Sequence, residues 1–445
     1  MNYDYVIVGA GSAGCVLANR LTEDPKKHVL LLEAGPRDTN IWIHVPLGYG
    51  KLFTRTDINW AYQSEPEPTL NGRRIFTPRG RVLGGSSSIN GLVYIRGQPE
   101  DYDGWGIPGW DFASLLPYFR KSENQARGAS EWHGVGGPFE VGDLERHELC
   151  DAFIDSAASL GFPRNADFNG ARQEGTGYYQ ASTCRGRRCS TATGYLKPAE
   201  KRPNLTVEVN TLATRIVLDG RRATGVQVGD RVVSGGEIIL AGGAFNSPQL
   251  LQLSGIGPGA LLQEKGIPVV ADLPVGEGLQ DHFYARTFWR CKRPITLNDD
   301  MASWFRQARI GLQYILNRSG PLSIAAGYAA AFVRTKAGLK QPDAQIYFIN
   351  FASERRGGEL HPFSAFTCSV SQLQVESRGS VAIRSADPRE APVIKYNYLA
   401  TENDRRVMVE GLKIVRRIAA AAPLAGYIEK VEFPGQAVRS DEELL

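Results

Sequence analysis

Residues 4–14 read DYVIVGAGSAG, and this stretch decides the fold of the chain. Residues 5–8 form an apolar run that is too short for a helix and rich in β-branched side chains, which predicts a buried strand. Gly9, Gly11 and Gly14 follow with the spacing G-x-G-x-x-G. In this motif the first glycine makes a tight turn, the second lets a pyrophosphate approach the backbone, and the third lets a helix pack closely on the strand.

The next segments complete a dinucleotide-binding unit. Residues 12–21 have the apolar spacing of a helix, and the N–H groups and dipole at its N-terminus would make an anion site. A second apolar run at 29–32 predicts a second strand. Glu33 follows it, about 20 residues after Gly14, where a carboxylate can accept a hydrogen bond from a ribose hydroxyl. The glycine motif alone is weak evidence, but the complete unit predicts a dinucleotide site.

Length and composition indicate an ordinary globular protein. A chain of 445 residues predicts two domains, and 42% apolar with 22% charged residues is ordinary globular composition. The net charge of +4 gives no indication of a nucleic-acid partner, and we expect none. No apolar run is long enough to cross a bilayer, and the chain starts with a strand instead of a signal peptide. We therefore expect a cytoplasmic protein, with association at the inner face of the membrane left open.

The six cysteines are scattered along the chain, and this argues against a metal site or a disulfide framework. Cys184 and Cys189 come closest to a pair, but no second pair or nearby histidine completes a zinc set. We expect reduced thiols and no bound metal.

The segment after Glu33 favours a flavin cofactor over a nicotinamide one. From Ala34 to about Gly104 the chain is rich in Gly, Pro, Asn and aromatic residues, where a nicotinamide-type fold would continue promptly with another helix and strand. Within it, residues 79–91 read RGRVLGGSSSING, and backbone of this kind can press against a flat ring or a phosphate. The alternative is a flexible loop, which the apolar residues inside the run disfavour.

The rest of the chain mixes strands and helices. Helices are expected at 112–122, 149–160, 303–316 and 402–420, and a further helix begins near residue 247. Short strands at 206–209, 214–218, 225–228 and 231–233 read as an antiparallel meander, and a separate buried strand is expected at 238–240. More strands are expected at 343–351, 365–373 and 381–384. Because a strand, a glycine run and a helix recur far from the first unit, the first sheet is expected to be assembled from separated segments.

Two of these helices have distinctive faces. In the 303–316 segment Trp304, Ala308, Leu312 and Ile315 fall on one stripe. The 402–420 helix carries basic residues on its outer face, which is more often merely solvated than bound to a membrane.

Three separated motifs give the chain a family resemblance. They are residues 9–14 with Glu33, residues 80–97, and residues 243–257, which read GAFNSPQLLQLSGIG. The first is generic, whereas the other two resemble motifs of the glucose–methanol–choline (GMC) oxidoreductases. The resemblance covers nearly the whole chain and is nearest to the bacterial alcohol and choline dehydrogenase branch.

The resemblance implies an α/β fold, α+β overall. It consists of an FAD-binding dinucleotide fold assembled from separated segments and a substrate domain built on a mainly antiparallel sheet plus helices. We expect residues 1–143 and 194–297 to form the FAD-binding domain, and residues 144–193 and 298–445 to form the substrate domain.

The resemblance also implies how FAD is bound. Pyrophosphate would lie over residues 9–14, the adenosine ribose on Glu33, the flavin along residues 82–93, and the adenine beside Val209. The implied cofactor-binding residues are Gly9, Gly11, Ser12, Ala13, Gly14, Glu33, Ala34, Val82, Gly84, Asn90, Gly91, Leu92, Val93, Val209, Ala241 and Gly242. Ile89 stands where some relatives have a histidine that bonds covalently to the flavin, so FAD is expected to be non-covalent.

The implied activity is transfer of a hydride from the CH–OH group of an alcohol, primary or choline-like, to flavin N5, with electrons passed to a quinone or another carrier. A base must take the hydroxyl proton, and histidine suits this role. In the family it comes from a C-terminal His-Pro-x-Gly-Thr motif, with an asparagine or a second histidine beside it. None of the six histidines here has that context.

We therefore assign no catalytic residue within the chain and expect the catalytic pair beyond Leu445. Ser440 and Glu443 make a capping box, which indicates a helix that begins only a few residues before the end. The chain alone is expected to oxidise alcohols negligibly. Three alternatives stay open: an oxidase of the same family that uses O2, a flavin-binding chain without turnover, and, more distantly, a nicotinamide enzyme.

Overall fold

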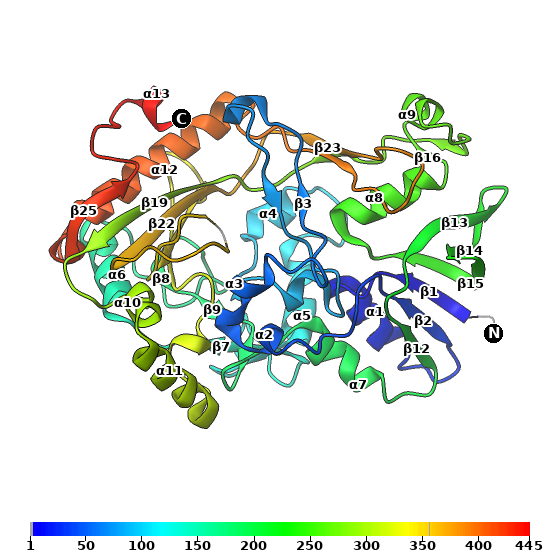
Figure 1. The fold of residues 1–445 in the computed structure, drawn as a ribbon, viewed down its shortest axis with the longest axis horizontal. Helices are drawn as coiled ribbons and strands as arrows, with labels where there is room; N and C mark the ends of the chain where they lie inside the picture. Colours follow the sequence, from blue (N-terminus) through cyan, green and yellow to red (C-terminus); the bar gives the residue numbers. More distant parts are fainter. Residues whose placement is uncertain (1–2, 356) are drawn as a thin grey trace.

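The computed structural model describes residues 3–355 and 357–445, which are arranged around two six-stranded sheets on opposite sides of the molecule (Figure 1). The first sheet has the strand order β12-β2-β1-β15-β14-β13. Its strands are β1 (Tyr3–Val8), β2 (Val29–Leu32), β12 (Leu205–Glu208), β13 (Ala213–Asp219), β14 (Arg222–Val228) and β15 (Arg231–Leu240). As predicted, the sheet is assembled from segments far apart in the sequence.

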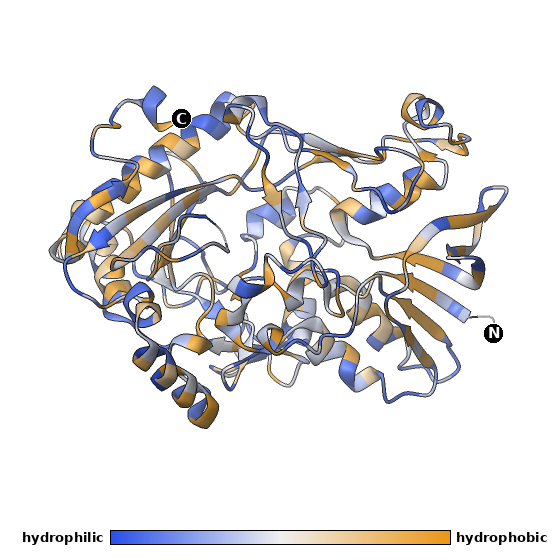
Figure 2. Cartoon of the chain, viewed as in Figure 1, coloured by the Kyte–Doolittle hydropathy of each residue, from blue (hydrophilic) through white to orange (hydrophobic). Residues whose placement is uncertain are grey.

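The parallel centre of this sheet explains its apolar sequence. β1 pairs in parallel with β2 on one side and with β15 on the other, and all four residues of β2 are buried. Strands covered on both faces read as near-continuous apolar runs. In Figure 2, β2 and the second half of β1 have hydrophobic colours. The first helix, α1 (Ser12–Leu21), has the predicted bounds.

Two strand predictions are wrong in detail. The 206–209 strand does not belong to the meander, because β12 pairs in parallel with β2. The predicted strands at 231–233 and 238–240 are one strand, β15, whose first half pairs antiparallel with β14 and whose second half pairs in parallel with β1. Gly235 lies between the two predicted segments and does not interrupt the strand. Instead it allows close contact, since a Cβ there would lie 2.7 Å from Val6 Cγ2.

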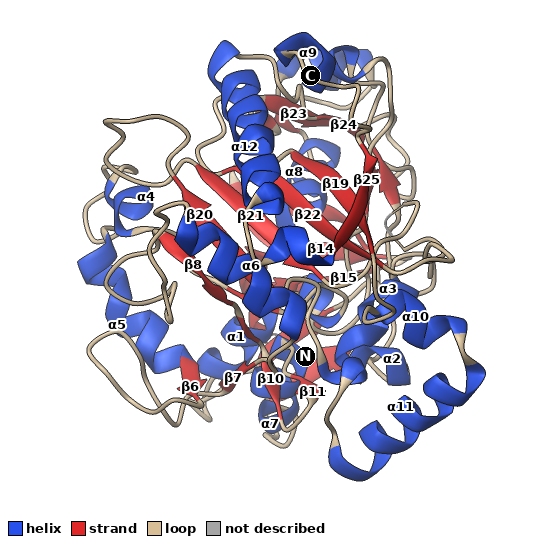
Figure 3. Cartoon of the chain, turned by 90° about the vertical axis from the view of Figure 1, so that its left-hand side faces the viewer, coloured by secondary structure: helices blue, strands red, loops and turns tan. Residues whose placement is uncertain are grey.

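The second sheet is antiparallel throughout, with the order β25-β19-β22-β21-β20-β8. Its strands are β8 (Gly175–Tyr178), β19 (Tyr284–Cys291), β20 (Ala329–Val333), β21 (Ala344–Ile349), β22 (Ala365–Gln372) and β25 (Ile428–Phe433). The helices α6 (Glu148–Ser159) and α12 (Glu402–Ala420) cover one face (Figure 3). This confirms the expected antiparallel sheet with helices.

Three of the basic residues of α12 bind other groups of the protein. Arg405 donates to the carbonyl oxygen of Leu399 at 2.7 Å, and Arg406 lies 3.3 Å from a carboxylate oxygen of Asp343. Lys413 lies 2.7 Å from Asp441. The outer face of this helix is therefore partly neutralised by its neighbours.

The remaining helices and short strands lie outside the two six-stranded sheets. The other helices are α2 (Ile41–His44), α3 (Tyr49–Leu52), α4 (Pro99–Asp103), α5 (Phe112–Ser122), α7 (Lys197–Ala199), α8 (Gly243–Leu253), α9 (Gly259–Glu264), α10 (Leu297–Ala302), α11 (Trp304–Asn317) and α13 (Asp441–Leu444). The short strands are β3 (Tyr62–Gln63), β4 (Phe76–Thr77), β5 (Val93–Tyr94), β6 (Glu123–Gln125), β7 (Phe139–Asp143), β9 (Gln180–Ala181), β10 (Thr183–Cys184), β11 (Arg187–Arg188), β16 (Ile256–Gly257), β17 (Ala271–Asp272), β18 (Glu277–Leu279), β23 (Gly379–Ala382) and β24 (Val393–Lys395).

The expected domain boundaries stay a prediction, and one strand does not fit them. β19 belongs to the second sheet although it lies inside the 194–297 segment, so the chain changes sheets before residue 297. No helix among residues 3–355 and 357–445 is long and apolar enough to cross a membrane. The six cysteines are free.

Candidate cofactor site

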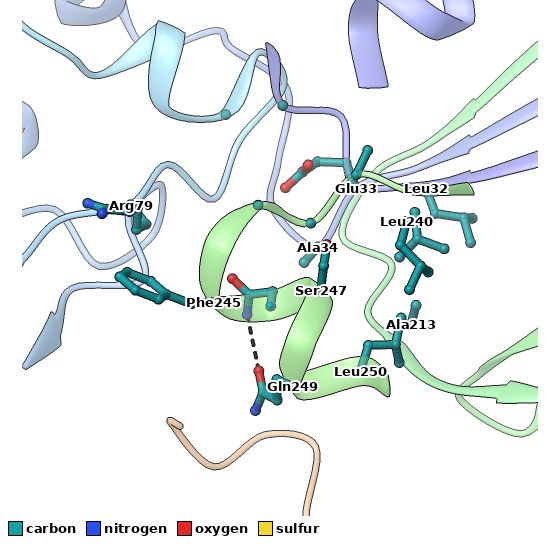
Figure 4. A pocket seen from close by; sticks show the side chains of 18 of the residues that line it. Leu32, Glu33, Ala34, Arg79, Ala213, Leu240, Phe245, Ser247, Gln249 and Leu250 are labelled. Carbon is teal, nitrogen blue, oxygen red and sulfur yellow. Dashed lines mark hydrogen bonds between the residues drawn. The ribbon is translucent and has the colours of Figure 1, made fainter. Parts of the chain in front are cut away.

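A cavity of about 510 Å³ opens at the carboxyl ends of the parallel strands (Figure 4). The last residues of β1, β2 and β15, which are Val8, Leu32 and Leu240, all line it. Ligands of open α/β sheets bind at this edge because the loops and helix N-termini converge there. The other lining residues are Gly9, Gly11, Ser12, Ala13, Glu33, Ala34, Trp60, Arg79, Gly80, Gly85, Ser86, Thr211, Leu212, Ala213, Ala241, Gly242, Gly243, Ala244, Phe245, Asn246, Ser247, Gln249, Leu250, Leu253 and Pro388.

The three glycines of the first motif have two different structural roles in this site. A Cβ at Gly9 would lie 2.6 Å from the carbonyl oxygen of Ala241, and a Cβ at Gly14 would lie 1.9 Å from that of Gly9. Both glycines therefore allow close packing within the protein. A Cβ at Gly11 would meet no protein atom closer than 3.9 Å, so its free space faces the cavity. This is the arrangement expected if a ligand approaches the backbone at the second glycine.

Two helix N-termini point positive partial charge at the cavity. α1 begins after Gly11 and α8 begins after Gly242, and neither N-cap is satisfied by a side chain. N–H groups in the first turn of a helix have no partner inside the helix, so they are available to an anion. Arg79 adds a full positive charge, with its guanidinium carbon 4.6 Å from the centre of the Phe245 ring. This part of the cavity is suited to a pyrophosphate.

Glu33 provides negative charge at another wall. It is only 6% exposed, and its two carboxylate oxygens accept from the backbone N–H groups of Ala10 (2.9 Å) and Gly35 (2.8 Å). Burial raises its pKa to about 7 despite these two bonds. Each carboxylate oxygen can accept a further bond, so a diol at the cavity wall can donate to it.

The 79–93 loop packs against the first glycine motif. A Cβ at Gly85 would lie 2.7 Å from the Cα atom of Gly11, and the N–H of Gly84 donates to the carbonyl oxygen of Ala10 at 2.8 Å. A Cβ at Gly84 would meet Ser88 Oγ at 2.3 Å, so this glycine serves packing inside the loop. Ile89 is buried in an apolar cluster with Val82 and others and does not line the cavity.

A buried arginine that the sequence did not reveal holds this loop. Arg188 is 3% exposed and donates to the carbonyl oxygens of Ile43, Ser87 and Asn90 and to Asn90 Oδ1, at 2.6–3.1 Å. Burial lowers its pKa to about 9. Because one rigid guanidinium ties four acceptors together, the loop has a fixed shape beside the cavity. Arg185, Arg187 and Arg188 stand close together in the sequence, and nothing in this pattern indicates which of them is buried.

The structure brings together half of the predicted cofactor residues at the cavity. Those that line it are Gly9, Gly11, Ser12, Ala13, Glu33, Ala34, Ala241 and Gly242. Gly14 belongs to the first turn of α1 and packs against Gly9. Six predicted residues belong to the neighbouring loop and do not line the cavity, namely Val82, Gly84, Asn90, Gly91, Leu92 and Val93. Val209 also lies outside the lining, whereas Thr211, Leu212 and Ala213, just after it, line the cavity. Their assignment as FAD contacts stays a prediction.

Several residues that line the cavity were not among the cofactor-binding residues predicted from the sequence. Trp60 and Arg79 come from the long excursion after Glu33, and Phe245, Asn246 and Ser247 come from the start of α8. The GAFNSPQ motif was visible in the sequence. Its residues could not be assigned to the site, because only the fold brings the start of α8 beside the first glycine motif.

None of the six histidines, all of which the structure describes, lines the cavity. His133 is held between Asp167 and Glu123. Burial alone would lower its pKa, but the two carboxylates raise it to about 9, so it is a charged structural group. His282 Nδ1 bonds to the carbonyl oxygen of Gln372 at 2.7 Å, which supports a structural role. Within residues 3–355 and 357–445 no group of three or more His, Cys, Asp and Glu side chains is arranged to hold a metal ion.

Comparison with known proteins decides the family. The family model for the N-terminal part of the GMC oxidoreductases matches residues 3–284, and the C-terminal model matches residues 375–445. The chain belongs to the GMC oxidoreductase family. It is 41% identical to an oxygen-dependent choline dehydrogenase of Brucella anthropi over 454 aligned residues, which cover all of this chain and 82% of that protein. It is 42% identical to the mitochondrial choline dehydrogenase of Mus musculus, covering 99% and 77% of the two chains.

Solved structures agree with this assignment. The fold matches a pyridoxine 4-oxidase from Mesorbium loti with a TM-score of 0.88 at 30% identity, covering all of this chain and 85% of the other. It also matches a formate oxidase from Aspergillus oryzae, studied for modification of its FAD, with a TM-score of 0.90 at 26% identity and the same coverage. GMC oxidoreductases depend on FAD. The cavity fits this cofactor, since it offers helix N-termini to a pyrophosphate and a carboxylate to a ribose.

Replacing Gly11 tests whether the cofactor uses the free space at the second glycine. Gly11→Val should abolish FAD binding and leave the fold intact, because the added side chain meets the cavity and not the protein. Bound flavin, read from the visible spectrum, and the thermal midpoint of the FAD-free protein measure the two effects. In the matched control Gly435→Val, at a position with no positive φ and with open space away from the site, flavin should be retained. Normal flavin content in Gly11→Val would move the pyrophosphate elsewhere.

The pH dependence of FAD binding tests Glu33. A ribose diol donates to the ionised carboxylate, whose pKa is raised to about 7 in the free protein, so FAD should bind about ten-fold more weakly at pH 6 than at pH 8. Glu33→Gln should remove this dependence and weaken binding at pH 8 by about 1–3 kcal/mol. Titration calorimetry at the two pH values measures both. A wild-type affinity that is the same at pH 6 and pH 8 would contradict a ribose bond to Glu33.

Proposed function

We propose that this chain binds FAD and belongs to an enzyme that oxidises the CH–OH group of a small alcohol, primary or choline-like, and passes the electrons to a quinone or another carrier. The observation that carries the proposal is the cavity at the carboxyl ends of β1, β2 and β15, where the glycine motif, two helix N-termini and Glu33 meet. The identity of over 40% with choline dehydrogenases supports the alcohol class.

In this proposal the chain binds and orients the cofactor. Bound FAD supplies the hydride acceptor. The N-termini of α1 and α8 with Arg79 compensate the pyrophosphate charge, and Glu33 fixes the ribose. The loop held by Arg188 gives the flavin a preformed wall. Ile89 has no nucleophilic atom, and it is 2% exposed, so FAD is held without a covalent bond to this position.

The similarity to choline dehydrogenases restricts the range of possible alcohol substrates more than the residues of the cavity do. Trp60 and Phe245 offer aromatic faces at the cavity, but Arg81 lies 5.2 Å over the Trp60 ring and Arg79 lies 4.6 Å over the Phe245 ring. These faces are already used by arginine. A quaternary ammonium group would need other aromatic residues or a carboxylate.

The base for the hydroxyl proton is not assigned to any residue of this chain. The relatives are longer than the stretch aligned here, and no histidine lines the cavity. A chain without this base would bind FAD and turn over alcohols negligibly, so a flavin-binding chain without turnover is part of the same proposal.

An O2-using alcohol oxidase is the second candidate. It is favoured by two comparisons: one relative is named an oxygen-dependent choline dehydrogenase, and two solved structures of similar fold are oxidases. The two candidates share the cavity and differ only in how the reduced flavin is reoxidised.

Acid precipitation tests how FAD is held. The purified protein should be yellow, and acid should release all of the flavin into the supernatant, because unfolding leaves no bond between cofactor and chain. Absorbance of the supernatant and of the washed pellet measures this. Yellow colour that stays with the polypeptide would refute non-covalent binding.

Anaerobic mixing with alcohols separates the functional alternatives. Because no histidine lines the cavity, the 445-residue chain should stay yellow with choline, a medium-chain alkanol or a benzylic alcohol, whereas an alcohol-oxidising enzyme of this family would bleach its flavin. Readmitted air should reoxidise a dehydrogenase slowly and an oxidase quickly. Rapid bleaching of residues 1–445 alone would place the base among the six histidines present.

A further inference from the structure

The largest group of exposed hydrophobic side chains lies on α11, which projects from the body of the molecule (Figure 3). Trp304, Phe305, Leu312, Ile315 and Leu316 are 57–80% exposed. We call these five side chains the α11 apolar face. At 100° per residue they occupy one arc of about 120°. An apolar stripe of this width on a surface helix is normally turned toward the core, and here it is turned to solvent.

The opposite side of α11 already makes the contacts that hold the helix. Ile310 and Tyr314 are the buried residues of α11, and the Tyr314 hydroxyl donates to the carbonyl oxygen of Gly186 at 2.8 Å. At helical spacing these two residues lie roughly opposite the middle of the α11 apolar face. The helix therefore cannot turn its apolar face inward without giving up this packing.

The charge around α11 is mainly positive. Arg309 and Arg318 belong to the helix and its C-cap, and Arg185 and Arg187 are exposed on the β10–β11 hairpin that Tyr314 contacts. Among the described residues none of these four has a carboxylate within 4 Å. The nearby acids are already engaged, since Asp299 caps α10 and Asp300 pairs with Arg306 at 3.7 Å. A second copy of this surface would bring like charges together, whereas an anionic surface would be complementary.

The segment after α11 connects it to the cofactor loop. The turn at Pro321–Ser323 follows the helix, and the N–H of Ala326 donates to the carbonyl oxygen of Gly91 at 2.8 Å. A Cβ at Gly91 would lie 2.2 Å from Ala326 Cβ, so the two segments are in tight contact. Whatever binds α11 is thus close in sequence and structure to the 79–93 loop.

We propose that the α11 apolar face docks on the surface of a bilayer that contains anionic lipid. The helix has the composition of an interfacial helix, with Trp, Phe, Leu and Ile on one face and arginine at its edges. Its 14 residues span about 21 Å, less than the hydrocarbon core, so it lies on the membrane and does not cross it. If the proposed function holds, docking would bring the cofactor loop to a lipid-soluble quinone, but docking itself does not depend on that function.

Vesicle binding of the 445-residue chain tests the proposal without measuring turnover. Vesicles of phosphatidylcholine with about one third phosphatidylglycerol should sediment the protein, and vesicles of phosphatidylcholine alone should sediment much less. High salt should weaken the binding. Trp304→Ser/Phe305→Ser should lower the partition coefficient at least about ten-fold, because two large apolar side chains are lost from the interface. Arg309→Gln and Arg318→Gln should each lower it about five-fold.

Trp110→Ser/Tyr118→Ser is the matched control, since these two aromatic residues are 53% and 68% exposed away from α11, and its binding should equal that of the wild type. Leu312→Ser/Ile315→Ser repeats the test if the first double variant is unfolded by circular dichroism. Failure of the folded wild type to bind anionic vesicles would overturn the proposal, and so would equal loss in the control. A dimer in light scattering that the α11 variants dissociate would also overturn it, by assigning the face to a second copy.

Discussion

The close approach of two backbone segments at Gly9 and Gly14 is the constraint on which the rest of the structure depends. With only 1.9 Å between a Cβ at Gly14 and the carbonyl oxygen of Gly9, no other residue at position 14 lets α1 start directly against the end of β1. Gly9 in turn has a φ of +102° and lies against Ala241. These contacts bring the ends of β1 and β15 and the N-termini of α1 and α8 to one edge of the sheet.

Long-range polar contacts then fix the loops around that edge. Glu33 accepts from the turn at Ala10 as well as from Gly35, so it ties the end of β2 to the end of β1. Arg188 ties the 79–93 loop to the segment at Ile43. Both are charged groups placed where water is excluded, and each is tolerated because every oxygen or guanidinium group has hydrogen-bond partners. The result is a cavity whose walls are held in place by the protein's own hydrogen bonds.

The second sheet is organised differently from the first, because all of its strands pair antiparallel. Its strands alternate direction, one of its faces meets α6 and α12 (Figure 3), and it takes strands from positions between 175 and 433. This sheet lies on the opposite side of the molecule from the first sheet (Figure 1). α11 stands apart from both sheets with its apolar arc outward, and among the described residues it carries the largest group of strongly exposed hydrophobic side chains.

The sequence by itself determined the local elements and the first half of the site. The bounds of α1, β2, α5 and α12 follow from periodicity and capping, and the roles of Gly9, Glu33 and Gly14 follow from a motif whose residues are close in the chain. Only the tertiary structure decided the partners of β12 and β15, the packing role of Gly84, the loop contacts of Arg188 and the entry of Thr211 and Phe245 into the cavity. Strand pairing and side-chain direction depend on segments many residues apart, and a single sequence carries no direct record of which distant segments meet.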